Sequence, residues 1–251
     1  MRIGAAFFDF DLTLGHMSPS HFAVYAQAAR EYGLDVDEET LRARPLDDAW
    51  DRWMTPLGAV HLAESASEAA FREVRIAIAA DRLRAALGDE RAASEATAIR
   101  RAGERIADLE GEARFYRLYD DALPCLRRLS EAGVRCVIVS NHVWRLPEIV
   151  DDLGAGAYLA GTITSARVGA RKPHPRIFEA ALAVSAVPPE ATVMVGDSVS
   201  ADVRGAERLG MHALLLDRGG KATPPADVRV IRSLDEVPLD WPPPQPSGAA
   251  S

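Results

Sequence analysis

The sequence has little of several features that mark particular protein classes. Only two of its 251 residues are cysteines, Cys125 and Cys136, and we expect both to be reduced structural thiols. No apolar run reaches the ~20 residues that a membrane-spanning helix needs, and the start does not resemble a secretory leader. These absences predict a cytoplasmic protein that has no membrane partner.

The sequence also has fewer basic than acidic residues. Lysine and arginine number 29 against 37 acidic residues, which gives a formal net charge of −8. This balance disfavours nucleic acid as a partner, although a local pocket on an acidic protein can still attract small anions. The six histidines are scattered, and no Cys/His cluster has zinc spacing. The sequence does not indicate an oligomeric state.

What is present is a rhythm of apolar runs and amphipathic segments. An apolar run over residues 3–14 predicts a strand that is buried on both faces, and the rhythm resumes near residue 120. Further strands are expected at Val134–Val139, Tyr158–Thr164, Thr192–Val195, Ala213–Leu216 and Val228–Ile231. Helices are expected between them, at Asp120–Ala132, Leu146–Leu153, Arg176–Val184 and Ser200–Leu209. This alternation predicts an α/β fold with a doubly wound parallel sheet of the Rossmann-like kind.

The segment between the first strand and residue 116 has a different character. It shows helical spacing and hardly any strand signal, most clearly over Ser20–Tyr32, Ala66–Ala86 and Ser94–Leu109. About 100 residues exceed what a crossover connection needs, so we expect an inserted helical domain. The predicted division is a core of residues 1–15 and 117–238, an insertion of residues 16–116, and a disordered Pro-rich tail of residues 239–251.

Polar side chains follow three of the predicted strands. Asp9 and Asp11 come after the first, Ser140 and Asn141 after the second, and Asp197 after the fourth. In a parallel sheet these groups lie along one edge and can converge on one crevice. Carboxylates ~4 Å apart would repel by roughly 4 kcal/mol per pair at an effective dielectric constant of about 20, so a cation is expected among them. An all-oxygen ligand set favours Mg²⁺.

Other residues near these strand ends suit a phosphate group. The Ser140 hydroxyl and the backbone N–H groups after it could hold phosphate oxygens. Lys172 lies in a Pro-rich loop, where it is either a phosphate ligand or an ordinary surface lysine. Asp202 either orients the metal ligands or faces water. A carboxylate nucleophile, a metal and a lysine together indicate phosphoryl transfer through an aspartyl-phosphate.

Four short motifs occur in an informative order. The chain resembles the haloacid dehalogenase-like hydrolase superfamily in Asp9-Phe-Asp11-Leu-Thr13, Val137-Ile-Val-Ser140-Asn141, Lys172-Pro-His-Pro and Gly196-Asp197-Ser-Val-Ser-Ala-Asp202. The resemblance covers residues 1–15 and about 117–238, and the inserted helical domain resembles the superfamily's first type of cap. It implies a Mg²⁺-dependent phosphohydrolase that acts on a small phosphorylated metabolite.

The resemblance also implies a role for each motif residue. Asp9 would attack phosphorus, while Asp11 would protonate the leaving oxygen and then activate water. The implied metal ligands are Asp9, Asp197 and the backbone carbonyl of Asp11, with Asp202 in support. The implied contacts of the phosphoryl group and its loop are Thr13, Ser140, Asn141 and Lys172, of which Thr13 would stabilise the loop.

Several alternatives stay open at this point. Dehalogenases of the superfamily lack an acid two residues after the nucleophile, so Asp11 favours phosphate esters, but a phosphomutase would keep both aspartates. A receiver domain and a non-catalytic binding module fit less well, since the insertion has no place in the first and no chemical group is missing for the second. Candidate substrate-reading residues, for each of which packing or exposure is the commoner role, are His16, His21, Arg44, Trp50, Trp53, His142 and Trp144.

Overall fold

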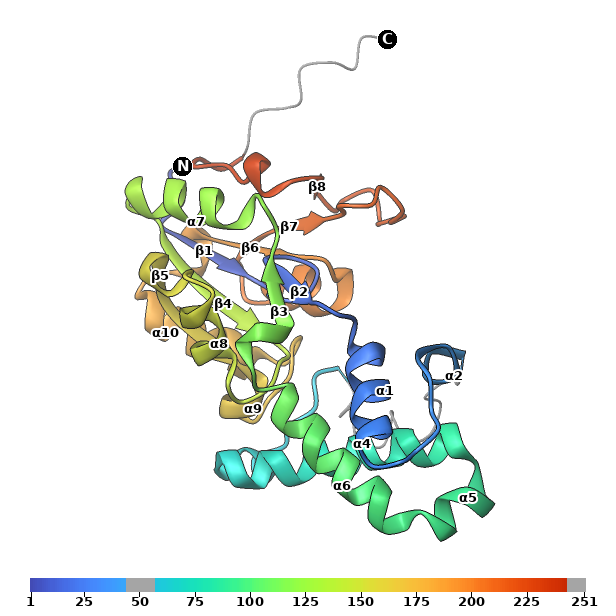
Figure 1. The fold of residues 1–251 in the computed structure, drawn as a ribbon. Coiled ribbons are helices and arrows are strands. Elements are labelled where there is room, and N and C mark those ends of the chain that lie inside the picture. Colours follow the sequence, from blue (N-terminus) through green and yellow to red (C-terminus); the bar gives the residue numbers. More distant parts are fainter. Residues whose placement is uncertain (44–56, 243–251) are drawn as a thin grey trace.

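The computed structural model describes residues 1–43 and 57–242, which form an α/β core with a helical domain at one end (Figure 1). Within these residues, the core sheet has six parallel strands in the order β5-β4-β1-β6-β7-β8. The strands are β1 (Ala5–Phe8), β4 (Arg135–Ser140), β5 (Leu159–Thr164), β6 (Thr192–Gly196), β7 (His212–Leu216) and β8 (Val230–Ile231).

Helices cover both faces of this sheet. They are α7 (Ala122–Glu131), α8 (Leu146–Asp152), α9 (Ser165–Val168), α10 (Pro175–Ser185) and α11 (Arg204–Glu207). Ala6 and Phe8 of β1 belong to the hydrophobic cluster that contains residues of α7 and α8, whereas Ala5 and Phe7 belong to the cluster with α10 and α11. Successive side chains of a strand point to opposite faces of the sheet. Because helices cover both faces, all residues of the strand must be apolar, which explains the continuous apolar run. The predicted doubly wound parallel sheet is confirmed.

Some elements differ in extent from the sequence prediction. The first strand covers only Ala5–Phe8 of the apolar run, and the last covers only Val230–Ile231. The helix expected over Ser200–Leu209 begins with a turn of π-helix at Val199–Val203 before α11. Short 3-10 turns occur at Glu64–Ala66, Ala113–Phe115, Gly156–Tyr158, Pro189–Ala191 and Leu234–Glu236.

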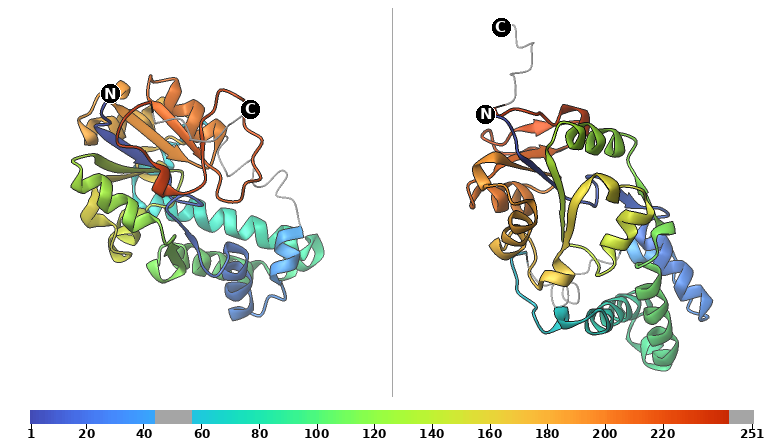
Figure 2. Two further views of the ribbon diagram at one scale, coloured as in Figure 1. Left: turned by 90° about the horizontal axis from the view of Figure 1, so that it is seen from above. Right: turned by 90° about the vertical axis from the view of Figure 1, so that its left-hand side faces the viewer.

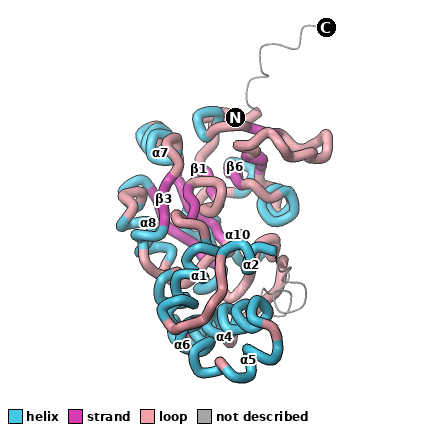
Figure 3. Tube along the Cα trace, turned by 45° about the vertical axis from the view of Figure 1, so that its right-hand side comes forward, coloured by secondary structure: helices cyan, strands magenta, loops and turns pink. Residues whose placement is uncertain are grey.

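The inserted segment is helical, as expected, and forms the cap. Its helices are α1 (His21–Glu31), α2 (Glu38–Ala43), α4 (Glu68–Leu87), α5 (Asp89–Ser94) and α6 (Ala96–Leu109). These helices gather at one end of the α/β core (Figures 2 and 3). Helices α4 and α6 approach closely at Gly103, where a Cβ atom would lie 3.0 Å from the Ile76 carbonyl oxygen. The small side chain therefore permits the contact that holds the cap together.

A two-stranded antiparallel ribbon joins the cap to the core. It consists of β2 (Gly15–Met17) and β3 (Tyr116–Leu118), with His16 opposite Arg117. Sequence analysis missed both strands, because three residues are too few to show a periodicity. The ribbon straddles the boundaries predicted at residues 15 and 117, and those boundaries stay a prediction.

The residues after Val237 pack against the core at first. The Ile3 N–H donates to the Leu239 carbonyl at 2.9 Å, the Trp241 N–H donates to the Met1 carbonyl at 2.7 Å, and the Trp241 ring stacks on His212. The prediction that residues 239–251 are disordered is therefore wrong for the start of that segment. The prediction relied on the Pro-rich composition and overlooked Leu239 and Trp241, whose side chains pack against the hydrophobic core. Residues 243–251 lie outside the described residues.

Two further expectations concern chemical environment. Cys125 on α7 and Cys136 on β4 are both buried and free, as expected of reduced thiols. Within residues 1–43 and 57–242, no helix has the length and apolarity that a membrane crossing requires.

Candidate active site

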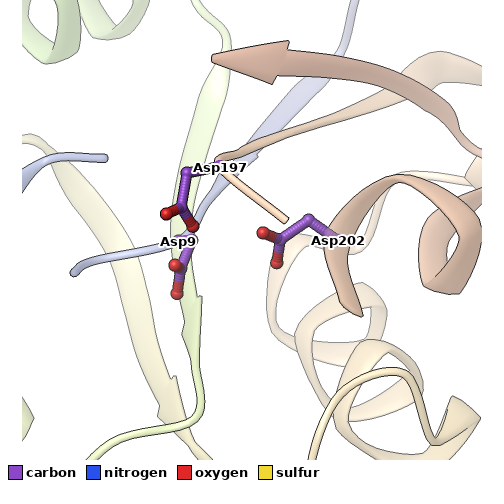
Figure 4. Close-up of side chains that lie close together, drawn as sticks. All are labelled: Asp9, Asp197 and Asp202. Atoms are coloured by element: carbon purple, nitrogen blue, oxygen red, sulfur yellow. The ribbon is translucent and has the colours of Figure 1, made fainter. Parts of the chain in front are cut away.

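The candidate site lies where three neighbouring strands end. Asp9 follows β1, Ser140 is the last residue of β4, and Asp197 follows β6, and these strands are adjacent in the order β4-β1-β6. Because the strands are parallel, their carboxyl ends bring the three side chains together. Figure 4 shows Asp9 and Asp197 close to each other, with Asp202 reaching toward them from the π-helical turn.

Asp9 is held by two donors at one of its oxygens. Ser140 Oγ donates to Asp9 Oδ1 at 2.8 Å, and Lys172 Nζ donates to the same oxygen at 2.7 Å. The Asp9 side chain is 11% exposed. Since neither donor occupies Oδ2, that oxygen can face an incoming phosphorus atom while the carboxylate stays fixed in orientation.

Lys172 is almost completely buried, so it is not an ordinary surface lysine. Its Nζ lies 2.6 Å from Asp202 Oδ1 as well as 2.7 Å from Asp9 Oδ1. Burial works to lower the pKa of Lys172, but the two carboxylates outweigh it and hold the pKa above its usual value. The Asn141 amide fixes the backbone of Lys172, accepting from its N–H at 2.7 Å and donating to its carbonyl at 3.2 Å. Asn141 thus positions the lysine.

The acidic groups at this edge could hold a metal ion. Oxygens of Asp9, Asp197 and Asp202 lie within 4.8 Å of one another. Burial, with repulsion from Asp9 and then Asp202, raises the pKa of Asp197 to about 7. A cation would relieve this crowding, and the all-oxygen donor set fits Mg²⁺.

Asp202 has a supporting place in this group. Its Oδ1 accepts from Lys172, and its Oδ2 accepts from the Ser198 N–H at 3.0 Å. A Cβ atom at Gly196 would lie 2.2 Å from Asp202 Oδ2, so only glycine leaves room for the carboxylate. With both its oxygens engaged, Asp202 is better placed to orient Lys172 and the turn after Asp197 than to bind the ion.

Asp11 has a different environment from Asp9. Its side chain is 52% exposed, and its Oδ2 lies 3.5 Å from Nε2 of the buried His142. Crowding by surrounding protein raises the pKa of Asp11, repulsion from Asp9 adds to this, and His142 opposes it. A carboxyl group with a raised pKa suits proton donation. The Asp11 side chain is not part of the carboxylate group described above, and the expectation that its backbone carbonyl binds metal stays a prediction.

The Thr13 side chain makes no hydrogen bond to the residues of the site. It is completely buried, and its Oγ1 has no hydrogen-bond partner among the described residues. Its carbonyl accepts from Arg218 Nη2 at 2.8 Å, and Arg218 in turn pairs with Asp121. The buried side chain and the carbonyl bond to Arg218 give Thr13 a structural place, and its expected role in stabilising the loop stays a prediction.

Two adjoining cavities lead away from Asp9. The inner cavity, of about 170 Å³, is lined by residues that include Asp9, Ser140 and Lys172. The cap cavity, of about 210 Å³, lies between cap and core. Asp11 and Asn141 line both, so the two cavities adjoin at these residues. A phosphate ester could place its phosphoryl group in the inner cavity and its leaving group in the cap cavity.

The lining of the cap cavity contains charged or titratable residues that sequence analysis did not single out. They are His61, Glu64, Arg75, Glu110 and Arg171. His61 Nε2 lies 3.1 Å from the Ser165 carbonyl oxygen, and the Arg171 N–H donates to the Ala59 carbonyl at 3.1 Å. These contacts fasten the cap to the core loop. Of these residues, only Arg171 had a sequence signal, which is its place next to Lys172. The others could not be predicted, because helical periodicity does not show which residues of the cap face the core.

The predicted substrate-reading residues are distributed unevenly. His21 and His142 line the cap cavity, and Trp144 lines an outer cavity of about 590 Å³ next to it. His16 packs on Tyr119, with ring centroids 4.8 Å apart, and lines neither cavity. The remaining candidates, Arg44, Trp50 and Trp53, lie outside the described residues.

A buried ion pair forms one wall of the cap cavity. Arg75 donates to both carboxylate oxygens of Glu110, at 2.9 and 2.6 Å, and His21 lies 3.1 Å from the same carboxylate. Burial works to raise the pKa of Glu110, but Arg75 outweighs it and holds the pKa well below its usual range. This pair fixes the position of Arg75 at the cavity.

Comparison with known proteins gives consistent results. A family model described as haloacid dehalogenase-like hydrolase matches residues 3–210. A phosphoserine phosphatase of Thermus thermophilus is 34% identical over 199 residues, 76% of this chain and 73% of that protein. A glyceraldehyde 3-phosphate phosphatase of Methanopyrus kandleri is 33% identical over 106 residues, 42% of this chain and 46% of that protein.

Solved structures share the fold at lower identity. A HAD phosphatase from Thermococcus onnurineus aligns with a TM-score of 0.58 and 24% identity, covering 94% of this chain and 95% of that one. A 2-haloacid dehalogenase from Pseudomonas syringae aligns with a TM-score of 0.64 and 22% identity, covering 93% of this chain and 96% of that one. Because phosphatases and dehalogenases both appear, the fold alone does not choose between them.

Proposed function

Because the chain belongs to the haloacid dehalogenase-like hydrolases and is an enzyme of their phosphatase type, we propose that it hydrolyses a small phosphate ester through an aspartyl-phosphate on Asp9. The observation that carries the proposal is the position of Asp9, whose Oδ1 is held by Ser140 and Lys172 beside Asp197. When bound, Mg²⁺ would be held by Asp9 and Asp197 and would offset the negative charge of the carboxylates and the phosphoryl group.

The residues divide the reaction into two steps. In the first, Asp9 Oδ2 forms a bond to phosphorus, the bond to the ester oxygen breaks, and Asp11 gives its proton to the departing oxygen. In the second, Asp11 takes a proton from water, whose oxygen attacks phosphorus and releases inorganic phosphate from Asp9. Lys172 and Ser140 keep the Asp9 carboxylate in one orientation through both steps.

Asp11 also favours a phosphatase over a dehalogenase. An alkoxide leaving group needs a proton, whereas a halide does not, and Asp11 supplies an acid with a raised pKa at the boundary of the inner and cap cavities. A phosphomutase would use the same two aspartates but would hand the phosphoryl group to a second hydroxyl. Release of inorganic phosphate into water distinguishes the two.

Among small phosphate esters, we put O-phosphoserine first. The relative that aligns with most of the chain bears the name phosphoserine phosphatase, and the cap cavity offers charges of both signs in Arg171 and Glu64. The leaving group of phosphoserine carries a carboxylate and an ammonium group, whereas that of glyceraldehyde 3-phosphate is uncharged.

A substrate panel tests the proposal. Phosphate release should be measured with O-phosphoserine, glyceraldehyde 3-phosphate and p-nitrophenyl phosphate, and chloride release with 2-chloropropionate, all with Mg²⁺. We expect phosphate from at least one ester, no chloride, and no activity in Asp9→Asn. Arg171→Gln and Glu64→Gln should lower kcat/KM for O-phosphoserine by roughly tenfold or more and leave p-nitrophenyl phosphate little changed. Chloride release without phosphate release would contradict the phosphatase assignment.

A further inference from the structure

Two of the cavities between cap and core share a wall. The cap cavity, of about 210 Å³, adjoins Asp11, and the outer cavity, of about 590 Å³, lies farther along α4 and α6. Phe71 and Arg75 of α4 and Val143 of the core line both cavities. These three residues therefore form the boundary between the two spaces.

Two of the three boundary residues are fixed in place. Arg75 donates to both oxygens of Glu110, whose side chain is only 4% exposed. Val143 has a short side chain, and its carbonyl accepts from Thr164 Oγ1 at 3.1 Å. Movement of either residue away from the boundary would break one of these hydrogen bonds.

Phe71 is the aromatic side chain at this boundary, and it lacks the hydrogen bonds that hold Arg75. In the part of the chain that the structure describes, it belongs to neither hydrophobic cluster, and it is only partly buried. It lies one helical turn before Arg75 on α4, so both side chains project from the same face of the helix. An aromatic ring therefore lies where the two cavities meet, outside both hydrophobic clusters.

The volumes of the two cavities differ in the size of leaving group that they can hold. A cavity of about 150 Å³ can hold a benzene molecule, so the cap cavity has room for a leaving group about as large as one substituted aromatic ring. It is smaller than the ~300 Å³ at which pockets for larger ligands begin. The outer cavity, at about 590 Å³, lies within that larger range but beyond Phe71.

We propose that Phe71 is a specificity-determining residue that closes the cap cavity toward the outer cavity and so restricts the enzyme to phosphate esters with compact leaving groups. The proposal rests on the proposed phosphatase function. Removal of the ring joins the two spaces, and esters with bulky leaving groups then reach Asp9 in a productive position.

The test compares two substrates in three proteins. The compact ester is p-nitrophenyl phosphate and the bulky one is adenosine 5′-monophosphate, and the proteins are wild type, Phe71→Ala and Val74→Ala. Val74 lines the cap cavity but not the outer one, so its truncation enlarges the first space and leaves the boundary in place. We expect Phe71→Ala to raise the ratio of kcat/KM for the bulky over the compact ester by about tenfold or more, and Val74→Ala to change it by about twofold at most.

A binding measurement gives a second readout that does not need turnover. Trp144 lines the outer cavity only, so an adenine base that enters this space should quench its fluorescence. In an Asp9→Asn background, adenosine 5′-monophosphate should quench the fluorescence of Trp144 in the Phe71→Ala and Phe71→Leu variants. It should not quench this fluorescence when Phe71 is retained. Replacement of Trp144 by phenylalanine should remove the effect.

The possible outcomes separate this proposal from the proposed function. If wild type hydrolyses neither ester nor any member of the substrate panel, the phosphatase function is wrong. If wild type hydrolyses the compact ester but Phe71→Ala, like Val74→Ala, leaves both the substrate ratio and the quenching unchanged, the role of Phe71 is wrong. If Phe71→Ala fails to fold, Phe71→Leu decides by the same two measurements.

Discussion

The ammonium nitrogen of Lys172 lies 2.6 Å from Oδ1 of Asp202, and both side chains are at most 2% exposed. The same nitrogen reaches Asp9 at 2.7 Å. One buried cation thus joins the residue proposed as nucleophile to the turn that follows Asp197. This arrangement makes Lys172 important for stability as well as for chemistry.

Loss of Lys172 should therefore have two separable effects. Lys172→Met leaves two carboxylates without their cation, and we expect the free energy of unfolding to fall by about 3–5 kcal/mol. Adding Asp202→Asn should return part of that loss, because one uncompensated charge is removed, while activity stays absent in both variants. Urea unfolding with chelator present measures the stabilities.

The exposed Lys221 provides the control for this experiment. Lys221→Met should change neither stability nor activity noticeably. If the losses in the free energy of unfolding from Lys172→Met and Asp202→Asn simply add in the double variant, the two residues do not interact as the distances indicate.

The second prediction concerns the metal. Chelation should abolish phosphatase activity, and Mg²⁺ should restore it, because Asp9 and Asp197 are expected to hold the ion together. Asp197→Asn should raise the Mg²⁺ concentration for half-maximal activity by at least tenfold, since a charged ligand becomes neutral. Asp35→Asn, an exposed change in the cap, is the matched control and should leave the requirement unaltered. Full activity in excess chelator would refute a metal role.

The third prediction concerns acid stability. Arg75 holds the pKa of Glu110 below its usual range, so this carboxylate stabilises the fold above the unfolded-state pKa of about 4.3. That contribution is lost as the pH falls through the lower pKa of the folded state. Wild type should thus lose more stability below about pH 4 than Glu110→Gln does, although the variant is less stable at pH 7. Urea unfolding at pH 7, 5, 4 and 3 shows whether the two curves converge; parallel curves would argue against a paired Glu110.

Much of the site followed from the sequence because it depends on strand order. Asp9, Ser140 and Asp197 end strands that are each a recognisable apolar run, and in a parallel sheet such ends share an edge. The pattern could not show how each side chain is held. That Asn141 binds the backbone of Lys172, and that Arg218 donates to the Thr13 carbonyl, depends on contacts between segments far apart in the chain.

The cap was less accessible to such reasoning. Its helices were evident from their spacing, but periodicity places a residue on a helix face without saying what that face meets. Phe71 and Arg75 could equally have faced solvent or another cap helix. Their place at a cavity follows from the way the β2–β3 ribbon and the contacts of His61 and Arg171 seat the cap on the core.

The fourth prediction tests the central claim, that Asp9 is phosphorylated and Asp11 serves both steps. Asp11→Asn keeps the backbone carbonyl but removes the acid, a change that typically costs 10²–10⁴-fold. Nitrophenolate hardly needs a proton, so p-nitrophenyl phosphate should still phosphorylate Asp9 in this variant, whereas alkyl phosphates should not. The phosphorylated enzyme should then accumulate because no base activates water.

The most direct measurement is a rapid-mixing experiment with Asp11→Asn and p-nitrophenyl phosphate, followed by mass spectrometry of the quenched protein. The account predicts a burst of about one nitrophenol per active site, little turnover afterwards, and a phosphoryl group on the peptide that contains Asp9. Asp9→Asn should give neither burst nor modified peptide. An Asp11→Asn enzyme that slows aryl and alkyl esters equally, with no burst and no phosphoryl group on Asp9, would contradict it.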